Sequence, residues 1–195
     1  MRKIPTLFLR DPDDMRRVLR EVNPAAAWVL DGEARATRKF DGTCVMLDSD
    51  ERWWARREVK PAKTSPPNYR PVQTDPATGK TVGWEPVEQS SFAKAHGQAL
   101  AASLGGAFTA GTYELCGPSV NRNPEGYGKH VLVPHGLFLL GDIPLDYDGL
   151  RGYLAELAYE GIVWHHPDGR MAKLKRRDFP PSECREDPVV TAAPS

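Results

Sequence analysis

A lysine at a break between two strand-like segments is the first residue whose position suggests chemistry. Lys39 lies between segments 34–38 and 43–47, and Gly42 soon afterwards lets the backbone approach a bound group. A lysine ammonium is unreactive at its free pKa of about 10.4, so a nucleophilic lysine needs a metal or other cations nearby. A simpler explanation is also open, because Asp41-Gly42 is a strong hairpin signal.

Charged residues within or beside apolar strand-like runs recur further along the chain. Lys173 and Lys175 flank Leu174, so both ammonium groups point to one face of a strand. Two adjacent ammonium groups favour an anion between them, and phosphate is the natural candidate. Glu160, on the preceding run, can hold a divalent cation, because Mg²⁺ prefers one or two carboxylates plus substrate phosphates. If each lysine is considered on its own, a simpler explanation is that it lies on a solvent-exposed strand face and pairs with Glu160 on the neighbouring strand.

Taken in order, the charged segments resemble the motifs of the covalent nucleotidyltransferases, the ATP-dependent RNA and DNA ligases and the mRNA capping guanylyltransferases. The similarity spans residues 34–179 and is closest to small ATP-dependent RNA ligases. The matching segments are Lys39–Gly42 (motif I), Tyr113–Gly117 (motif III), Leu137–Ile143 (motif IIIa), Glu160–Val163 (motif IV) and Lys173–Lys175 (motif V).

The resemblance implies a role for each matched charged residue. Lys39 would attack the α-phosphorus of ATP, releasing pyrophosphate and leaving a lysyl-AMP phosphoramidate. Lys173 and Lys175 would bind the nucleotide, neutralise the developing phosphate charge and help to keep Lys39 unprotonated. Glu114 would contact the ribose or a metal-bound water, and Glu160 would hold the metal ion, Mg²⁺ or Mn²⁺.

Recognition of the nucleotide would involve two further residues. Phe138 would stack on the nucleobase, and Arg57, or Arg56 by a one-residue slip, would contact the nucleotide. Many RNA ligases carry Glu immediately before the nucleophile, whereas this chain has Arg38, which leaves the mode of adenine recognition open. AMP would then pass to the 5′-phosphate of an RNA, and a 3′-hydroxyl would displace it, as in RNA repair.

Other functions are consistent with the same motifs. A DNA-nick ligase or a capping-type transferase would differ in acceptor or in nucleotide donor. A non-catalytic module that retains the fold would bind nucleotide or nucleic acid without forming an adduct. The chain has no room for an OB-fold domain after motif V, so a helper protein or surface cations would grip the RNA; the candidates are Arg52, Lys60, Lys63 and Arg176.

Composition limits the class of protein. The 195 residues include 26 Lys or Arg and 26 Asp or Glu, giving a net charge of zero, so a polyanion must meet a local basic patch. Three widely spaced cysteines fit neither a disulfide framework nor a zinc cluster and indicate a reducing compartment. No apolar run approaches the roughly 20 residues of a membrane helix. We therefore expect a soluble, cytoplasmic monomer.

The elements that must position these residues indicate an α+β fold. The resemblance implies a nucleotidyltransferase (ATP-grasp-like ligase adenylation) domain over residues 1–179, with mainly antiparallel sheets, flanking helices and a nucleotide cleft between the sheets. Residues 180–195 are expected to be a disordered tail. His165 and His166 are expected to be turn residues. The expected elements are strands 6–10, 108–116, 130–134 and 136–140, helices 15–22, 88–104 and 149–157, a three-stranded meander 33–38, 43–48 and 52–59, a long excursion 60–86, and a hairpin of 159–165 with 171–176.

Overall fold

The computed structural model describes residues 2–103 and 106–180, whose strands form sheets of two, three and six strands. All of these strand pairs are antiparallel, in agreement with the expected mainly antiparallel sheets. In chain order the elements are β1 (Phe8–Arg10), β2 (Val18–Val22), η1 (Pro24–Asp31), β3 (Arg35–Lys39), β4 (Thr43–Leu47), β5 (Trp53–Val59), β6 (Arg70–Thr74), β7 (Thr81–Pro86), η2 (Val87–Gln89), α1 (Ala93–Ala102), β8 (Gly111–Cys116), β9 (Val131–Pro134), α2 (Tyr147–Glu156), β10 (Gly161–His165), β11 (Met171–Lys175) and η3 (Arg176–Asp178).

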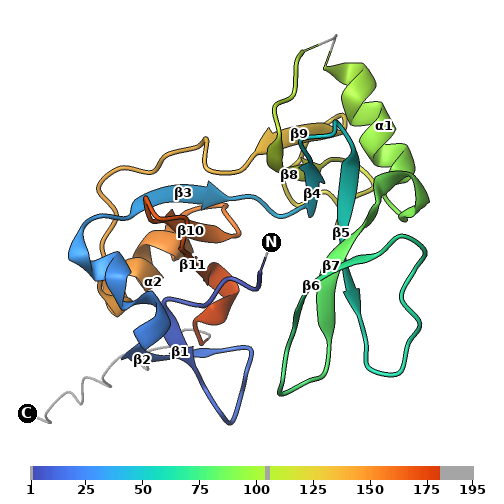
Figure 1. Ribbon diagram of the computed structural model, residues 1–195. Helices are drawn as coiled ribbons and strands as arrows, with labels where there is room; N and C mark the ends of the chain where they lie inside the picture. Colours follow the sequence, from blue (N-terminus) through green and yellow to red (C-terminus); the bar gives the residue numbers. More distant parts are fainter. Residues whose placement is uncertain (1, 104–105, 181–195) are drawn as a thin grey trace, which may run out of the picture.

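The six-stranded sheet has the order β6-β7-β5-β4-β8-β9 and packs against α1 on one side (Figure 1). Ala95 and Ala99, four residues apart, lie on one helix face and are buried against the sheet. Val45 and Leu115, on the neighbouring strands β4 and β8, are fully buried in the same core. The alternation of side chains leaves the opposite face of these strands free for polar residues.

The three-stranded sheet has the order β11-β10-β3 and forms the other half of the molecule (Figure 1). Its covered face carries Ile162 and Trp164 of β10 and Leu174 of β11, all fully or almost fully buried. They pack with residues of α2, η1 and the β1–β2 hairpin. The opposite face carries Lys173 and Lys175, as the alternation in the sequence predicted.

The chain passes from one sheet to the other at Lys39. β3 pairs with β10, whereas β4 pairs with β5 and β8, so the predicted meander is wrong in its first strand. Asp41-Gly42 is consequently a crossing between sheets and not a hairpin turn. Gly42 lies so close to β8 that an added Cβ would sit 2.3 Å from the carbonyl oxygen of Leu115. This close approach explains the glycine.

The predicted helix 15–22 is also wrong. Residues 18–22 form β2, which pairs with β1 through Phe8–Val22 and Arg10–Val18. Asp13 and Asp14 lie in the connection between the two strands, where Asp14 accepts a hydrogen bond from the backbone of Arg16 at 3.1 Å. The apolar spacing fits a helix, but pairing with β1 buries Val18 in the core and overrides it.

The predicted excursion 60–86 contains regular structure. β6 and β7 form a hairpin that extends the large sheet, and Val82 and Trp84 of β7 are buried. The Pro- and Thr-rich composition obscured these two strands. Segment 136–140 is not a strand of a sheet; it contacts β3 through an isolated bridge between Thr37 and Leu139.

The remaining elements match their predictions with shifted ends. The terminal hairpin pairs Gly161–Lys175 through His165–Met171, and β8, β9 and α2 lie where expected. The helix expected at 88–104 begins only at Ala93, and its predicted end at Leu104 lies outside the described residues. The predicted tail beyond residue 180 also lies outside them. No helix among the described residues is long and apolar enough to cross a membrane.

Candidate active site

A cavity of about 960 Å³ is lined by residues of both large sheets. Lys39 enters it from the end of β3, Arg56 from β5 and Glu114 from β8, while β11 contributes Lys173 and Lys175. Residues 5–7 run beside β11, where Leu7 and Lys173 are joined by a backbone hydrogen bond of 2.9 Å. The amino-terminal segment therefore also reaches the cavity, between the two halves of the molecule (Figure 1).

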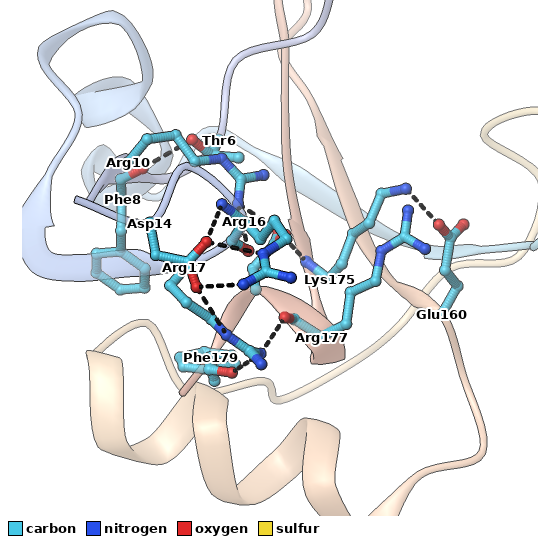
Figure 2. Close-up of polar contacts among 11 residues, drawn as sticks. Thr6, Phe8, Arg10, Asp14, Arg16, Arg17, Glu160, Lys175, Arg177 and Phe179 are labelled. Carbon is cyan, nitrogen blue, oxygen red and sulfur yellow. Dashed lines mark hydrogen bonds and ion pairs between the residues drawn. The ribbon is translucent and has the colours of Figure 1, made fainter. Parts of the chain in front are cut away.

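Glu160 lies between Lys39 and Lys175 and forms an ion pair with each of them. The strand register creates this arrangement: Gly161 is opposite Lys39 on one side and Lys175 on the other. Figure 2 shows Lys175 reaching the Glu160 carboxylate, with Arg177 alongside. The Glu160 side chain is only 8% exposed, so solvent screens these pairs weakly.

The two pairs set the protonation of the site. Burial disfavours the Glu160 carboxylate, but the charges of Lys39 and Lys175 outweigh it and hold the pKa of Glu160 below its ordinary value. Burial likewise disfavours the Lys39 ammonium, yet the carboxylates of Glu160 and Glu114 raise the pKa of Lys39. In this structure the carboxylates therefore favour the charged form of Lys39, and the expected help of Lys173 and Lys175 in deprotonating it during the reaction stays a prediction.

Lys173 is the lysine whose pKa is depressed. Burial, followed by the charges of Lys175 and Lys39, lowers the pKa of Lys173 to about 8. Its ammonium has no ion pair with any described residue. A partly buried cation without a counter-charge is costly, and a bound anion would reduce that cost.

The cavity is strongly positive although the chain as a whole is neutral. Within the described residues its lining holds nine Lys or Arg side chains against four carboxylates, a surplus of five positive charges. A concave surface with walls of low dielectric constant concentrates such a field and attracts anions. The cations are Arg2, Lys3, Arg38, Lys39, Arg56, Arg122, Lys173, Lys175 and Arg177, and the carboxylates are Asp41, Glu58, Glu114 and Glu160.

Glu114 is fixed by two partners at the end of the cavity near β8. One oxygen accepts a hydrogen bond from the Gly42 amide at 3.1 Å, and the other lies 2.8 Å from His135 Nε2. The other ring nitrogen of His135 lies 2.9 Å from the Thr112 hydroxyl. Sequence reasoning missed His135. Its position follows from the β8–β9 pairing, which no local pattern indicates.

His165 lies in β10 and lines the cavity, so the expectation of a turn residue is wrong for it. Its Nε2 atom is 3.0 Å from the Thr37 hydroxyl. Burial, followed by the charges of His135 and Arg35, lowers the pKa of His165 and keeps the ring neutral near pH 7. His166 does lie in the turn region, where it contacts Glu33.

Two predicted nucleotide contacts lie outside the cavity lining. Arg57 is half-exposed and lies 3.8 Å from Glu85, whereas its neighbour Arg56 lines the cavity. The geometry thus favours the one-residue slip. Phe138 is 46% exposed and packs edge-to-face on Phe40 with ring centroids 5.0 Å apart. Its role in stacking on a base stays a prediction.

The carboxylates suit a metal only in part. Within the described residues no three His, Cys, Asp or Glu side chains gather to hold a metal ion. Magnesium bound with a nucleotide needs only one or two carboxylates, and Glu160 is of the right chemical type. One oxygen of Glu160 accepts a hydrogen bond from Lys39 and the other from Lys175. Glu160 can therefore bind a metal only if at least one of these lysines moves away. Glu114 has both oxygens engaged as well, by Gly42 and His135.

Comparison with known proteins relates the chain to RNA ligases. The family model for RNA ligase 1 matches residues 105–194. RNA ligase 1 of Danio rerio is 26% identical over 258 aligned positions, which cover 89% of this chain and 79% of the relative. RNA ligase 1 of Rattus norvegicus gives the same identity over 90% and 79% of the two chains. RNA ligase 1 of Pongo abelii is 39% identical over 74 positions, 33% of this chain and 23% of the relative. The matches confirm the resemblance that the motifs indicated.

Proposed function

We propose that this relative of the nucleotidyltransferase-type RNA ligases is an ATP-dependent RNA ligase that works through a lysyl-AMP intermediate on Lys39. The observation that carries the proposal is the convergence of Lys39, Glu160 and the β11 lysines in one positively charged cavity. A triphosphate supplies the anion that Lys173 lacks. The similarity to proteins named RNA ligase 1 supports RNA as the acceptor.

The first step joins Lys39 to AMP. The Lys39 Nζ atom forms a bond to the α-phosphorus, the bond from that phosphorus to the bridging oxygen of the β-phosphate breaks, and pyrophosphate leaves with the electron pair. Lys173, Lys175 and Arg56 would neutralise charge on the phosphate oxygens. A divalent cation held by Glu160 would supply further neutralisation of the phosphates.

The nucleophile must first lose a proton. In the ligand-free protein Lys39 is charged and paired with Glu160. When triphosphate and a divalent cation occupy the cavity, Glu160 would exchange its lysine partners and would no longer raise the pKa of Lys39, whose proton would pass to solvent. Lys173, Lys175 and Arg56 would offset the phosphate charge beside Lys39. Nucleotide binding and deprotonation are then coupled, so Lys39 becomes reactive only in the presence of its substrate.

The remaining steps seal the RNA. The 5′-phosphate of one strand attacks the phosphorus of lysyl-AMP, which restores Lys39 and leaves AMP joined to the RNA end by a pyrophosphate linkage. The 3′-hydroxyl of the second strand then attacks the 5′-phosphate, forming the phosphodiester and releasing AMP. Both acceptors are anionic and would enter along the basic lining of the cavity.

Labelled nucleotides test this function. With ATP labelled at the α-phosphate and Mg²⁺ or Mn²⁺, label should appear on the protein and then on a 5′-phosphorylated RNA, with ATP favoured over GTP. Joined RNA should accumulate when a 3′-hydroxyl end is present. Preferential labelling by GTP would indicate a capping-type transferase. Transfer of AMP only to nicked DNA would indicate a DNA ligase. Nucleotide binding without covalent labelling would indicate a non-catalytic module.

A further inference from the structure

The loop between β8 and β9, residues 117–130, lies against the segment that carries the proposed nucleophile. Its Glu125 side chain is 4% exposed, although a buried carboxylate is costly without partners. One oxygen accepts a hydrogen bond from the Asp41 amide at 2.8 Å, and the other is ion-paired with Arg38. Both oxygens of Glu125 therefore hold residues on either side of Lys39.

Asn121, from the same loop, holds the end of that segment. Its side-chain amide donates to the Gly42 carbonyl at 2.6 Å and to a carboxylate oxygen of Asp41 at 3.1 Å. Together with Glu125 it fixes the backbone immediately after the nucleophile at two points. Neither residue belongs to a motif that sequence reasoning identified.

The backbone of the loop is strained where it makes these contacts. Asn121, Arg122 and Asn123 have φ values of 48°, 65° and 57°, three consecutive residues in the left-handed region. Asparagine tolerates this region, but arginine does so less readily. Asn123 braces the turn by two hydrogen bonds to the Tyr127 backbone, at 3.0 and 3.1 Å. Such strain persists only where surrounding contacts determine the conformation, and it concentrates at functional sites.

Arg38 completes the arrangement. Its guanidinium lies over the rings of Phe40 and Tyr159, at 4.3 and 4.2 Å from their centroids. Tyr159 directly precedes Glu160, the ion-pair partner of Lys39. The side chain of Arg38 therefore contacts Glu125 of the loop, Phe40 beside Lys39, and the residue next to Glu160. The arginine that stands where many RNA ligases have glutamate thus has a structural partner in Glu125.

We infer that Glu125 and Asn121 are positioning residues that hold segment 38–42, and with it Lys39, in line with the α-phosphorus of ATP. The inference rests on the proposed function. Neither residue needs to touch the nucleotide, because both act on the backbone beside Lys39. The positioning of a nucleophile acts on the chemical step, so its loss should lower the rate of adenylylation rather than the affinity for ATP.

Two variants separate the contacts from the fold. Glu125→Gln keeps an oxygen for the Asp41 amide but removes the charge that Arg38 needs. Asn121→Gly keeps the left-handed backbone, which glycine adopts freely, and removes only the side-chain amide. Matched controls are Glu156→Gln, an exposed glutamate of α2, and Asn68→Gly, an exposed asparagine with a φ of 56°.

The measurement is the single-turnover rate of AMP attachment at saturating ATP, with the dissociation constant of ATP and the melting temperature of each variant. We expect the rate to fall on the order of 100-fold in Glu125→Gln and Asn121→Gly, with ATP affinity retained and the controls at the wild-type rate. Wild-type rates in either folded variant would overturn its assignment, as would a loss confined to ATP affinity. If Glu125→Gln unfolds, Asn121→Gly decides the inference alone. An unlabelled wild-type protein would instead refute the proposed function, and the inference with it.

Discussion

The ammonium group of Lys39 is ion-paired with the carboxylate of Glu160, although the two residues lie on different segments and meet only in the folded chain. Glu160 raises the pKa of Lys39, so the pair favours the charged ammonium, which is not a nucleophile. In the proposed function, Lys39 becomes reactive when the nucleotide separates this pair.

Removal of the Glu160 charge should make Lys39 more acidic. In Glu160→Gln the burial of Lys39 remains while the largest raising charge is gone, so the pKa of Lys39 should fall relative to the wild type. Competitive acetylation of the ATP-free protein over a pH series, with mass-spectrometric quantification of the Lys39 peptide, measures this directly. The midpoint of reactivity should move to lower pH. A midpoint at or above the wild-type value would contradict the account, and Glu156→Gln is the control.

Binding of an anion should draw a proton onto Lys173. Because the pKa of Lys173 is about 8 in the ligand-free protein, about half of these side chains are neutral at pH 8. A bound triphosphate favours the charged form and raises that pKa, so binding should take up protons at pH 8 and less at pH 6.5. Calorimetric titration with ATP, without metal, in buffers of different ionisation enthalpy reports the uptake. It should diminish in Lys173→Met but persist in Lys94→Met, on the exposed side of α1; equal uptake in both would refute the assignment.

Arg56 and Arg57 form a matched pair for testing which arginine binds the nucleotide. Arg56 lines the cavity, and its Nε atom is buried without a hydrogen-bond partner among the described residues. Arg56→Ala should weaken ATP binding on the order of 10- to 100-fold, from about 1.5–3 kcal/mol for hydrogen bonds to charged groups. Arg57→Ala should change it little. Equilibrium binding of ATP to both variants distinguishes the two arginines. A larger loss of ATP affinity in Arg57→Ala would identify Arg57 as the nucleotide contact instead.

Gly42 should tolerate no side chain. The Cβ of an alanine would lie 2.3 Å from the Leu115 carbonyl and 2.9 Å from Cys116 Sγ, so the crossing segment must move. Gly42→Ala should lower the free energy of unfolding by about 1–3 kcal/mol and slow AMP attachment. Gly152→Ala, within α2 and with no atom within 4 Å of the added Cβ, should instead stabilise the protein by roughly 0.5–1 kcal/mol. Urea unfolding of both variants provides the comparison; equal stability would show that the crossing is not tightly packed.

Local sequence patterns were sufficient to predict the part of the site that the β10–β11 hairpin forms. The alternation of Lys173, Leu174 and Lys175 defines both the strand and the face of its lysines, because side-chain direction alternates along any strand. The turn His166–Gly169 fixes the register of the hairpin, which places Glu160 beside Lys175. These inferences needed only neighbouring residues.

The positions of the other site residues, on β3, β5, β8 and the β8–β9 connection, depend on contacts between segments that are distant in the sequence. Whether β3 pairs with β4 or with β10 is decided by packing over long sequence separation, and Asp41-Gly42 is compatible with both. The same limit applies to His135, Asn121 and Glu125, which reach the site through the β8–β9 connection. Alternation on β5 shows that Arg56 and Arg57 face opposite ways but not which face borders the cavity.

The position of the covalent adduct tests the central claim most directly. The wild-type protein, incubated with ATP and Mg²⁺ and then digested, should carry one AMP moiety on the peptide that contains Lys39, and Lys39→Ala should carry none. Lys175→Met and Lys173→Met should reduce the yield without moving the adduct. AMP on another residue, or undiminished labelling of Lys39→Ala, would contradict the assignment of Lys39 as the nucleophile.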